Sequence, residues 1–186
     1  MTKRFFDNII TLVRNVCIGV MSVTVELQKL FAADSGSIPL RADFDLSETE
    51  LGGEYPFKRP FSFVGQVINR AGAVTLEGEV SGDYEIACDR CGAMFTERVK
   101  VPIDFVVVET APEEERDDYL VAENGKLELD PVVRTEVLLA LPTKHLCKVD
   151  CRGLCSNCGA DLNKGECSCS KKADNPFADA LSAFFD

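Results

Sequence analysis

The chain contains the pattern Cys-x-x-Cys-Gly twice, as Cys88-Asp-Arg-Cys91-Gly92 and as Cys155-Ser-Asn-Cys158-Gly159. Two thiolates three positions apart can bind one metal ion from a tight turn. The glycine that follows can adopt the positive φ that points backbone N–H groups at the sulfurs. Two further close pairs are Cys147/Cys151 and Cys167/Cys169. Eight cysteines in four pairs therefore predict two zinc sites with four thiolate ligands each.

Loop length predicts how the four pairs combine, because closing a short loop costs less entropy than closing a long one. The second Cys-x-x-Cys pair lies close in sequence to the last pair, so these two are expected to share one ion. The predicted sites are then Cys88, Cys91, Cys147 and Cys151, and Cys155, Cys158, Cys167 and Cys169. Two other ways of matching the pairs stay open, as does His145 in place of a cysteine in the first site.

A disulfide framework is the rival interpretation, and it requires an oxidising compartment. Residues 1–20 are the one candidate for an export signal, but Arg14 and Asn15 interrupt the apolar stretch, Asp7 precedes it, and no small-x-small cleavage site follows. The stretch is also too short and too charged to span a membrane. We therefore interpret it as an amphipathic N-terminal extension or as upstream sequence translated ahead of a true start at Met21. The expected location is cytoplasmic, with reduced cysteines, and no membrane partner is expected.

The charge distribution bears on the class of partner. The chain carries 31 acidic and 20 basic residues, a net charge of −11, which disfavours nucleic-acid binding by the molecule as a whole. Residues 142–172 differ, since six basic and three acidic residues give this segment a charge of +3. The remainder of the chain therefore carries −14. A zinc ion with four thiolates carries about −2, so two filled sites would offset that local positive charge.

Alternating apolar residues predict an α+β protein built on an antiparallel β-sheet or partial barrel. Short breaks at Ala71-Gly72 and Ser81-Gly82 are expected to be hairpin turns. The expected strands are Ser22–Gln28, Leu40–Leu46, Phe61–Asn69, Ala73–Val80, Asp83–Cys88, Phe95–Val108 and, shorter, Lys126–Leu129.

One helix is expected over residues 130–141, with Asp130 as its N-cap and Pro131 as its first residue. Val133, Val137 and Leu141 form the apolar stripe that would pack on the sheet. The acidic run 112–118 reads as a solvated loop. The predicted organisation is a β domain over residues 21–141, a cysteine-rich metal-binding segment over 142–172, and a C-terminal tail with a short helix over 173–186.

Five stretches along the chain occur in a characteristic order: Cys88-Asp-Arg-Cys91, Leu127-Glu-Leu-Asp130, Val133-Arg-Thr-Glu-Val-Leu-Leu-Ala-Leu-Pro142, Cys147 through Asn163, and Asn175-Pro-Phe177-Ala. This order resembles the bacterial YceD family, the large ribosomal RNA subunit accumulation proteins, which also have plastid relatives. The resemblance covers roughly Met21 to the C-terminus. It implies a small cytosolic protein needed for normal accumulation of large-subunit (23S) ribosomal RNA, and it supplies no catalytic residues.

Three classes of function follow. The leading one is a metal-stabilised protein that binds ribosomal RNA, a large-subunit ribosomal protein, or both. Its expected RNA-binding residues are Arg90, Lys144, Lys148, Arg152 and Lys164. The second is a protein–protein adaptor without RNA contact, favoured by the net charge of −11.

The third class, an enzyme, is disfavoured, and no small-molecule substrate is expected. Cys151, Cys155 and Cys158 match the spacing of a radical-SAM iron–sulfur site, but only 28 residues follow Cys158, too few for the barrel such enzymes need. A Cys-x-x-Cys redox site needs a helix N-terminus after a strand, whereas a second strand is expected after Cys91. Iron–sulfur chemistry therefore remains the weaker alternative to zinc.

Overall fold

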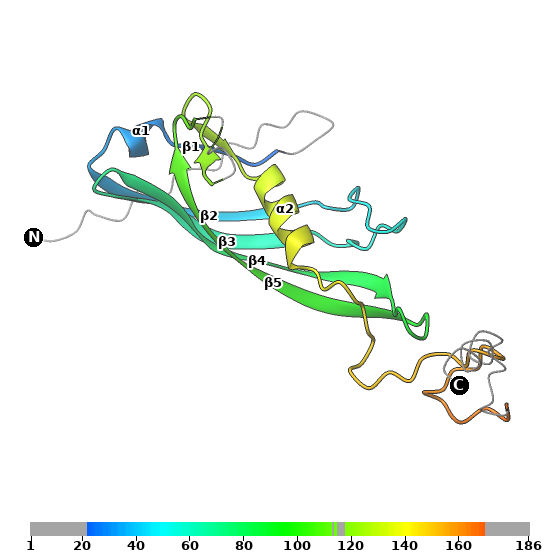
Figure 1. Ribbon diagram of the computed structural model, residues 1–186. Coiled ribbons are helices and arrows are strands. Elements are labelled where there is room, and N and C mark those ends of the chain that lie inside the picture. Colours follow the sequence, from blue (N-terminus) through cyan, green and yellow to red (C-terminus); the bar gives the residue numbers. More distant parts are fainter. Residues whose placement is uncertain (1–21, 113, 115–117, 170–186) are drawn as a thin grey trace, which may run out of the picture. The chain divides into compact units, whose positions relative to one another are not determined.

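A computed structural model describes residues 22–112, 114 and 118–169 (Figure 1). The predictions for residues 1–20 and 173–186, and most of the acidic run 112–118, lie outside these residues. The described chain forms two compact units. The first, here called the sheet unit, comprises residues 22–85 and 96–142, and the second, called the cysteine unit, comprises residues 86–95 and 143–169.

An open five-stranded sheet with strand order β2-β3-β4-β5-β6 dominates the sheet unit, and the predicted α+β class is confirmed. Strands β2, β3 and β4 pair antiparallel, while β6 pairs parallel with the end of β5. A two-stranded sheet joins β1 to β7. The strands are β1 Thr24–Glu26, β2 Ser35–Phe44, β3 Phe61–Arg70, β4 Ala73–Ala87, β5 Met94–Val108, β6 Leu120–Val121 and β7 Lys126–Glu128, and the helices are α1 Gln28–Phe31 and α2 Asp130–Ala140.

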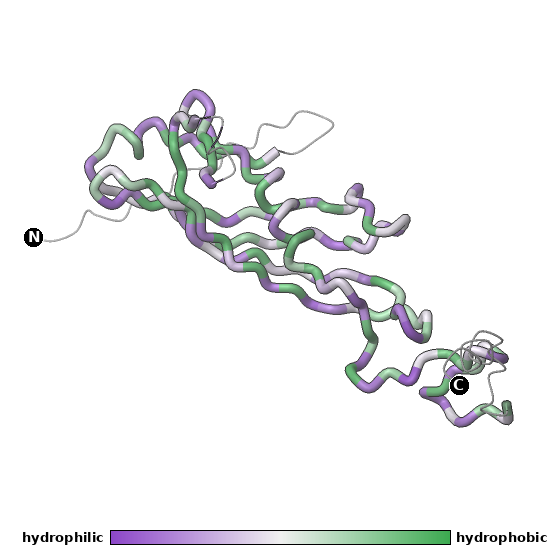
Figure 2. Tube along the Cα trace, in the orientation of Figure 1, coloured by the Kyte–Doolittle hydropathy of each residue, from purple (hydrophilic) through white to green (hydrophobic). Residues whose placement is uncertain are grey.

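The core forms on one face of the long strands, as the alternation of hydropathy along them indicates (Figure 2). Side chains with period-2 spacing lie on the same face of a strand, so each strand contributes every second residue to the core. The largest buried side chains include Phe44, Phe61, Phe63, Leu76, Tyr84 and Ile103. The Tyr84 hydroxyl donates a hydrogen bond to Glu97 Oε2 at 2.8 Å, and burial raises the pKa of this phenol.

The two predicted hairpin turns have different outcomes. Ala71 and Gly72 both have positive φ, at 53° and 90°, and connect β3 to β4 as expected for a two-residue turn. The turn predicted at Ser81-Gly82 is wrong, because β4 continues through it to Ala87. A Cβ on Gly82 would lie 2.5 Å from the ring of Phe61. The glycine there makes room for an aromatic ring against the strand and does not reverse the chain.

The N-terminal segment also differs from its prediction. Strand β1 is only three residues long, and helix α1 begins at Gln28. The short strand expected near Lys126 is present as β7, and it pairs with β1. The predicted strand Ser22–Gln28 was therefore too long at both ends.

Helix α2 lies where it was predicted, but its capping differs. Leu129 is the N-cap and Asp130 the first helical residue. The Asp130 carboxylate accepts a hydrogen bond from the backbone N–H of Val23, so it ties the start of the helix to the segment before β1. Val133 and Val137 are buried as expected, while Leu141 lies just past the helix and is half-buried. Among the described helices, none combines the length and apolar character that a membrane span requires.

Asn69 holds α1 against the sheet, and we expect Asn69→Ala to destabilise the sheet unit by about 2–3 kcal/mol. Its Nδ2 donates to the carbonyl oxygens of Leu30 and Ala33 at 2.8 and 2.9 Å, and its Oδ1 accepts from Gly72 N–H at 2.8 Å. The residue is 2% exposed, so water cannot replace these bonds. Urea unfolding measures the loss. Ser62→Ala, which removes an exposed bond to Asp43, is the control and should change stability by less than about 0.5 kcal/mol; equal losses would contradict the prediction.

Candidate metal centres

The two Cys-x-x-Cys-Gly turns have the same backbone structure. In the first, Cys88 N–H donates to the carbonyl of Ala93 at 2.9 Å, and Gly92 N–H donates to the carbonyl of Cys88 at 2.8 Å. The second turn repeats both bonds at 2.8 Å, between Cys155, Ala160 and Gly159. Gly92 and Gly159 have φ values of 68° and 71°, as the sequence predicts for both glycines. An alanine follows the glycine in each turn, so the repeated sequence pattern is Cys-x-x-Cys-Gly-Ala, one residue longer than the pattern recognised from the sequence.

The eight cysteine sulfurs gather into two sets, within each of which all four Sγ atoms lie within 4.8 Å of one another. The way in which the four cysteine pairs combine into two sets is the one expected from loop length. His145 is in neither set, and among the described residues both sets contain only sulfur atoms. The first sulfur set is Cys88, Cys91, Cys147 and Cys151, and the second sulfur set is Cys155, Cys158, Cys167 and Cys169.

The sulfur–sulfur distances in the first set fit a single tetrahedral ion. Cys88 Sγ lies 3.8 Å from Cys151 Sγ, and Cys91 Sγ lies 3.7 Å from Cys147 Sγ. A tetrahedron with zinc–sulfur bonds of about 2.3 Å has edges of about 3.8 Å. A disulfide would bring the sulfurs to about 2.05 Å. The described cysteines are thus unpaired by disulfides, and the two measured distances in the first set suit four ligands of one ion.

Each set contains one sulfur that ionises easily and one that resists ionisation. The backbone N–H of Cys147 lowers the pKa of Cys88 to about 6, and the backbone N–H of Asn157 lowers the pKa of Cys155 to about 6. Burial raises the pKa of Cys147 to about 12, and a hydrogen bond to Cys158 raises the pKa of Cys169 to about 12. Crowded thiolates repel one another, so all four sulfurs of a set can be ionised at neutral pH only if a cation lies among them.

The two middle residues of the first turn hold the later part of the cysteine unit in place. Asp89 forms two hydrogen bonds with His145: its N–H donates to the His145 carbonyl at 2.8 Å, and its Oδ2 accepts from the His145 N–H at 2.7 Å. Arg90 Nη1 donates to the carbonyl of Cys151 at 2.8 Å. The Arg90 carbonyl accepts from Leu154 N–H at 3.1 Å. Asp89 was not singled out in the sequence, because a contact 56 residues away has no local pattern.

Gly153 permits the close approach of these two segments. Its φ is +73°, and a Cβ at this position would lie 2.9 Å from the carbonyl oxygen of Arg90. The residue is buried. Any other amino acid would be strained by the backbone conformation and by the contact.

The five basic residues proposed to bind RNA all belong to the cysteine unit, but they differ in what they contact. Arg90 is engaged with the Cys151 carbonyl. Arg152 lies 3.8 Å from Glu166, and Lys164 lies 3.4 Å from Asp161. Lys144 and Lys148 are exposed and make no ion pair with any described residue.

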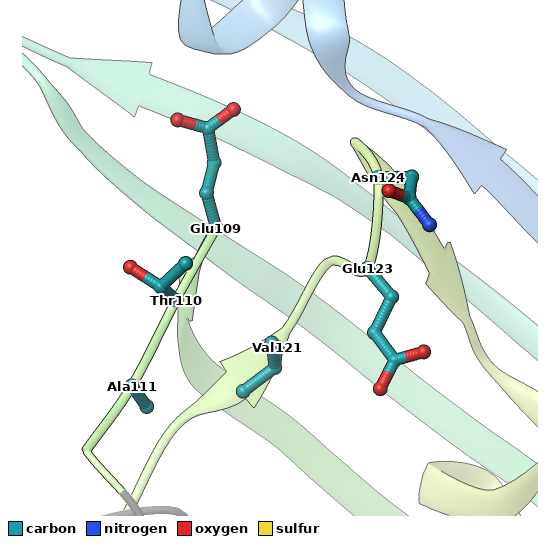
Figure 3. Close-up of a pocket in the computed structure, with 6 residues that line it drawn as sticks. All are labelled: Glu109, Thr110, Ala111, Val121, Glu123 and Asn124. Atoms are coloured by element: carbon teal, nitrogen blue, oxygen red, sulfur yellow. The ribbon is translucent and has the colours of Figure 1, made fainter.

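A surface pocket of about 320 Å³ lies in the sheet unit, and no sequence pattern had indicated it. Its two acids, Glu109 and Glu123, extend away from each other in Figure 3 and do not form a carboxylate pair. This arrangement is unlike the paired acids of general acid–base catalysis. The lining residues are Glu109, Thr110, Ala111, Val121, Glu123 and Asn124.

Comparisons with known proteins place these features in a family. The family described as large ribosomal RNA subunit accumulation protein YceD matches residues 76–185, a stretch that contains all eight cysteines of the two sets. An Arabidopsis thaliana protein named large ribosomal RNA subunit accumulation protein YCED homolog 1, chloroplastic, is 25% identical over 149 residues, which cover 64% of this chain and 46% of that relative. The chain thus spans about half the length of this relative.

No solved structure matches the chain. The family match covers more than half of the sequence, from near the start of β4 through both sulfur sets. The chain belongs to the YceD family.

Proposed function

We propose that this protein is a non-catalytic, zinc-stabilised binding protein that acts in ribosome biogenesis in the cytoplasm and supports the accumulation of large-subunit (23S) ribosomal RNA. The family match over residues 76–185 carries the proposal, because the family is described by the accumulation of this RNA and not by a reaction. The matched stretch includes both sulfur sets, which makes the metal centres part of what the family match covers.

Zinc suits the two sulfur sets better than an iron–sulfur cluster. Structural zinc takes four ligands in a closed tetrahedron, and the 3.7–3.8 Å spacing in the first set has that size. A cluster whose irons each bind a different cysteine would hold the sulfurs farther apart. We therefore propose one zinc ion for each set, with Cys88, Cys91, Cys147 and Cys151 as ligands of one ion and Cys155, Cys158, Cys167 and Cys169 as ligands of the other.

Lys144 and Lys148 are the strongest candidates for contact with RNA phosphates. Both are exposed and make no ion pair with described residues, so neither would lose an existing interaction on binding. Arg152 and Lys164 are partly neutralised by neighbouring acids, and such exposed pairs are weak enough to exchange for phosphate. Arg90 would contribute least, since its guanidinium holds the Cys151 carbonyl.

The double reversal Lys144→Glu/Lys148→Glu should weaken binding to large-subunit ribosomal RNA. The plot of log K against log salt has a negative slope, and each lost phosphate contact reduces its magnitude by about 0.7–0.9. The slope of the double variant should therefore be shallower by about 1.5. Binding is measured at a series of salt concentrations. The control is Lys29→Glu/Lys58→Glu, which changes the net charge equally in the sheet unit. Equal slopes for the two variants would show that Lys144 and Lys148 do not contact RNA.

A protein–protein adaptor is the second candidate, and the charge distribution favours it. Outside residues 142–172 the chain carries −14, which suits a basic ribosomal protein better than a phosphate backbone. Recovery of a large-subunit ribosomal protein with this chain after nuclease treatment would support the adaptor. Loss of every ribosomal partner on nuclease treatment would support direct RNA binding.

A further inference from the structure

One side chain connects the two sulfur sets. Asn163 lies in the loop between Cys158 and Cys167, which closes the second set. Its amide Nδ2 nevertheless lies 3.4 Å from the sulfur of Cys151, a member of the first set. A residue positioned by one predicted metal site therefore donates a hydrogen bond to a ligand atom of the other.

The orientation of this amide is fixed by its other partners. Asn163 Oδ1 accepts from the backbone N–H of Arg152 at 2.9 Å. Its Nδ2 also donates to the carboxylate of Asp161 at 2.9 Å, and the same carboxylate accepts from the Asn163 backbone N–H at 2.9 Å. The backbone N–H of Arg152 requires an acceptor and the carboxylate requires a donor, so the NH₂ group must face the Cys151 sulfur.

The backbone provides a parallel connection. Leu162 N–H donates to the Gly153 carbonyl at 2.9 Å, and Leu154 forms an antiparallel bridge with Asp161. Leu154 N–H in turn donates to the carbonyl of Arg90, in the first turn. The loop that closes the second set is thus hydrogen-bonded to the segment that completes the first.

We propose that Asn163 is a positioning residue that couples the two metal sites, so that filling the second sulfur set raises the zinc affinity of the first. This inference rests on the proposed zinc binding. A metal in the second set orders the loop that carries Asn163, and the ordered amide donates to the Cys151 thiolate and disperses its charge. Hydrogen bonds to ligand atoms of this kind are worth about 10- to 100-fold in metal affinity. Coupling is reciprocal, so filling the first set raises the zinc affinity of the second equally.

The test measures zinc affinity at the first set in the full-length chain by competition with a chelator. Three proteins are compared with the unaltered one: Asn163→Ala, the double variant Cys167→Ser/Cys169→Ser, and the combination of all three changes. Each of the first two should lower the affinity about 10-fold. The combination should lower it no further than the double variant, because both changes remove the same hydrogen bond. Val149→Ala, at a position of the same unit that is 95% exposed, is the control and should leave the affinity unchanged.

Cadmium substitution provides a readout that general loosening of the loop would not mimic. With ¹¹³Cd in both sets, Asn163→Ala should shift the resonance of the first set and leave that of the second in place. Additive affinity losses in the combined variant, or equal shifts of both resonances, would overturn the coupling while leaving zinc binding intact. If neither set binds zinc in the unaltered protein, the proposed metal function fails as well.

Discussion

We expect the unaltered protein to bind two zinc ions per chain and Cys151→Ser to bind one. Cys151 is 2% exposed, and its sulfur lies 3.8 Å from that of Cys88. A serine hydroxyl does not ionise at neutral pH and is a poor zinc ligand, so the first set would keep three usable ligands. Metal-binding energy is also folding energy in small domains, about 10–16 kcal/mol for a structural zinc in zinc-finger peptides. The variant should therefore lose order as well as metal.

Elemental analysis with native mass spectrometry counts the ions, and amide hydrogen exchange reports the lost order. Exchange should accelerate in the first turn and around His145, whose backbone hydrogen bonds depend on Asp89. The matched control is Cys17→Ser, which makes the same substitution at the one cysteine outside the two sets and should retain two ions. Two zinc ions in Cys151→Ser would show that the first set is not a metal site.

Gly65→Ala should cost the sheet unit about 3 kcal/mol or more. Gly65 of β3 faces Gly78 of β4, and a Cβ on Gly65 would lie 2.4 Å from the carbonyl oxygen of Glu77 and 2.8 Å from the Gly78 Cα. These neighbours are backbone atoms within a paired sheet and cannot rotate away as a side chain can. The same Cβ would lie 2.5 Å from the ring of Phe63, which is 1% exposed. Overpacking a core of this kind typically costs 1–3 kcal/mol and sometimes more.

A loss of that size should lower the melting temperature by about 10 °C or more for a unit of this length. Thermal and urea unfolding measure it. Gly165→Ala makes the same substitution where no atom lies within 4 Å of the added Cβ and the backbone is not in the positive-φ region. It should unfold like the original protein. A Gly65→Ala protein of undiminished stability would mean that β3 and β4 do not pack as closely as described.

The local patterns in the sequence predicted most of the strands and both cysteine turns. Period-2 alternation located β3 and β5 to within one residue, because burial of one face imposes that pattern on any strand. The error at Gly82 arose because glycine serves two purposes, a turn or room for a neighbouring ring, and the sequence does not distinguish them. Loop entropy was enough to predict which cysteine pairs lie together.

The side chains that support the sulfur sets could not be predicted. Asp89 contacts a residue 56 positions away, and Asn163 contacts one 12 positions away. Neither contact repeats with a period or forms a recognisable spacing. The bond from Arg90 to the Cys151 carbonyl could not be predicted either, since a basic residue between two cysteines gives no sign that its guanidinium binds a carbonyl.

The cysteine unit is discontinuous in the chain, with residues 86–95 at the connection from β4 to β5 and the remainder near the C-terminus. During synthesis Cys88 and Cys91 leave the ribosome more than 50 residues before Cys147, so the first set holds only half of its sulfurs during that interval. A truncation after Pro142 would leave those two thiols without the other two ligands of their set, and it would remove six of the eight sulfurs. Premature termination between Pro142 and Cys147 would therefore remove ligands of both proposed metal centres at once, even though it leaves every strand of the sheet encoded.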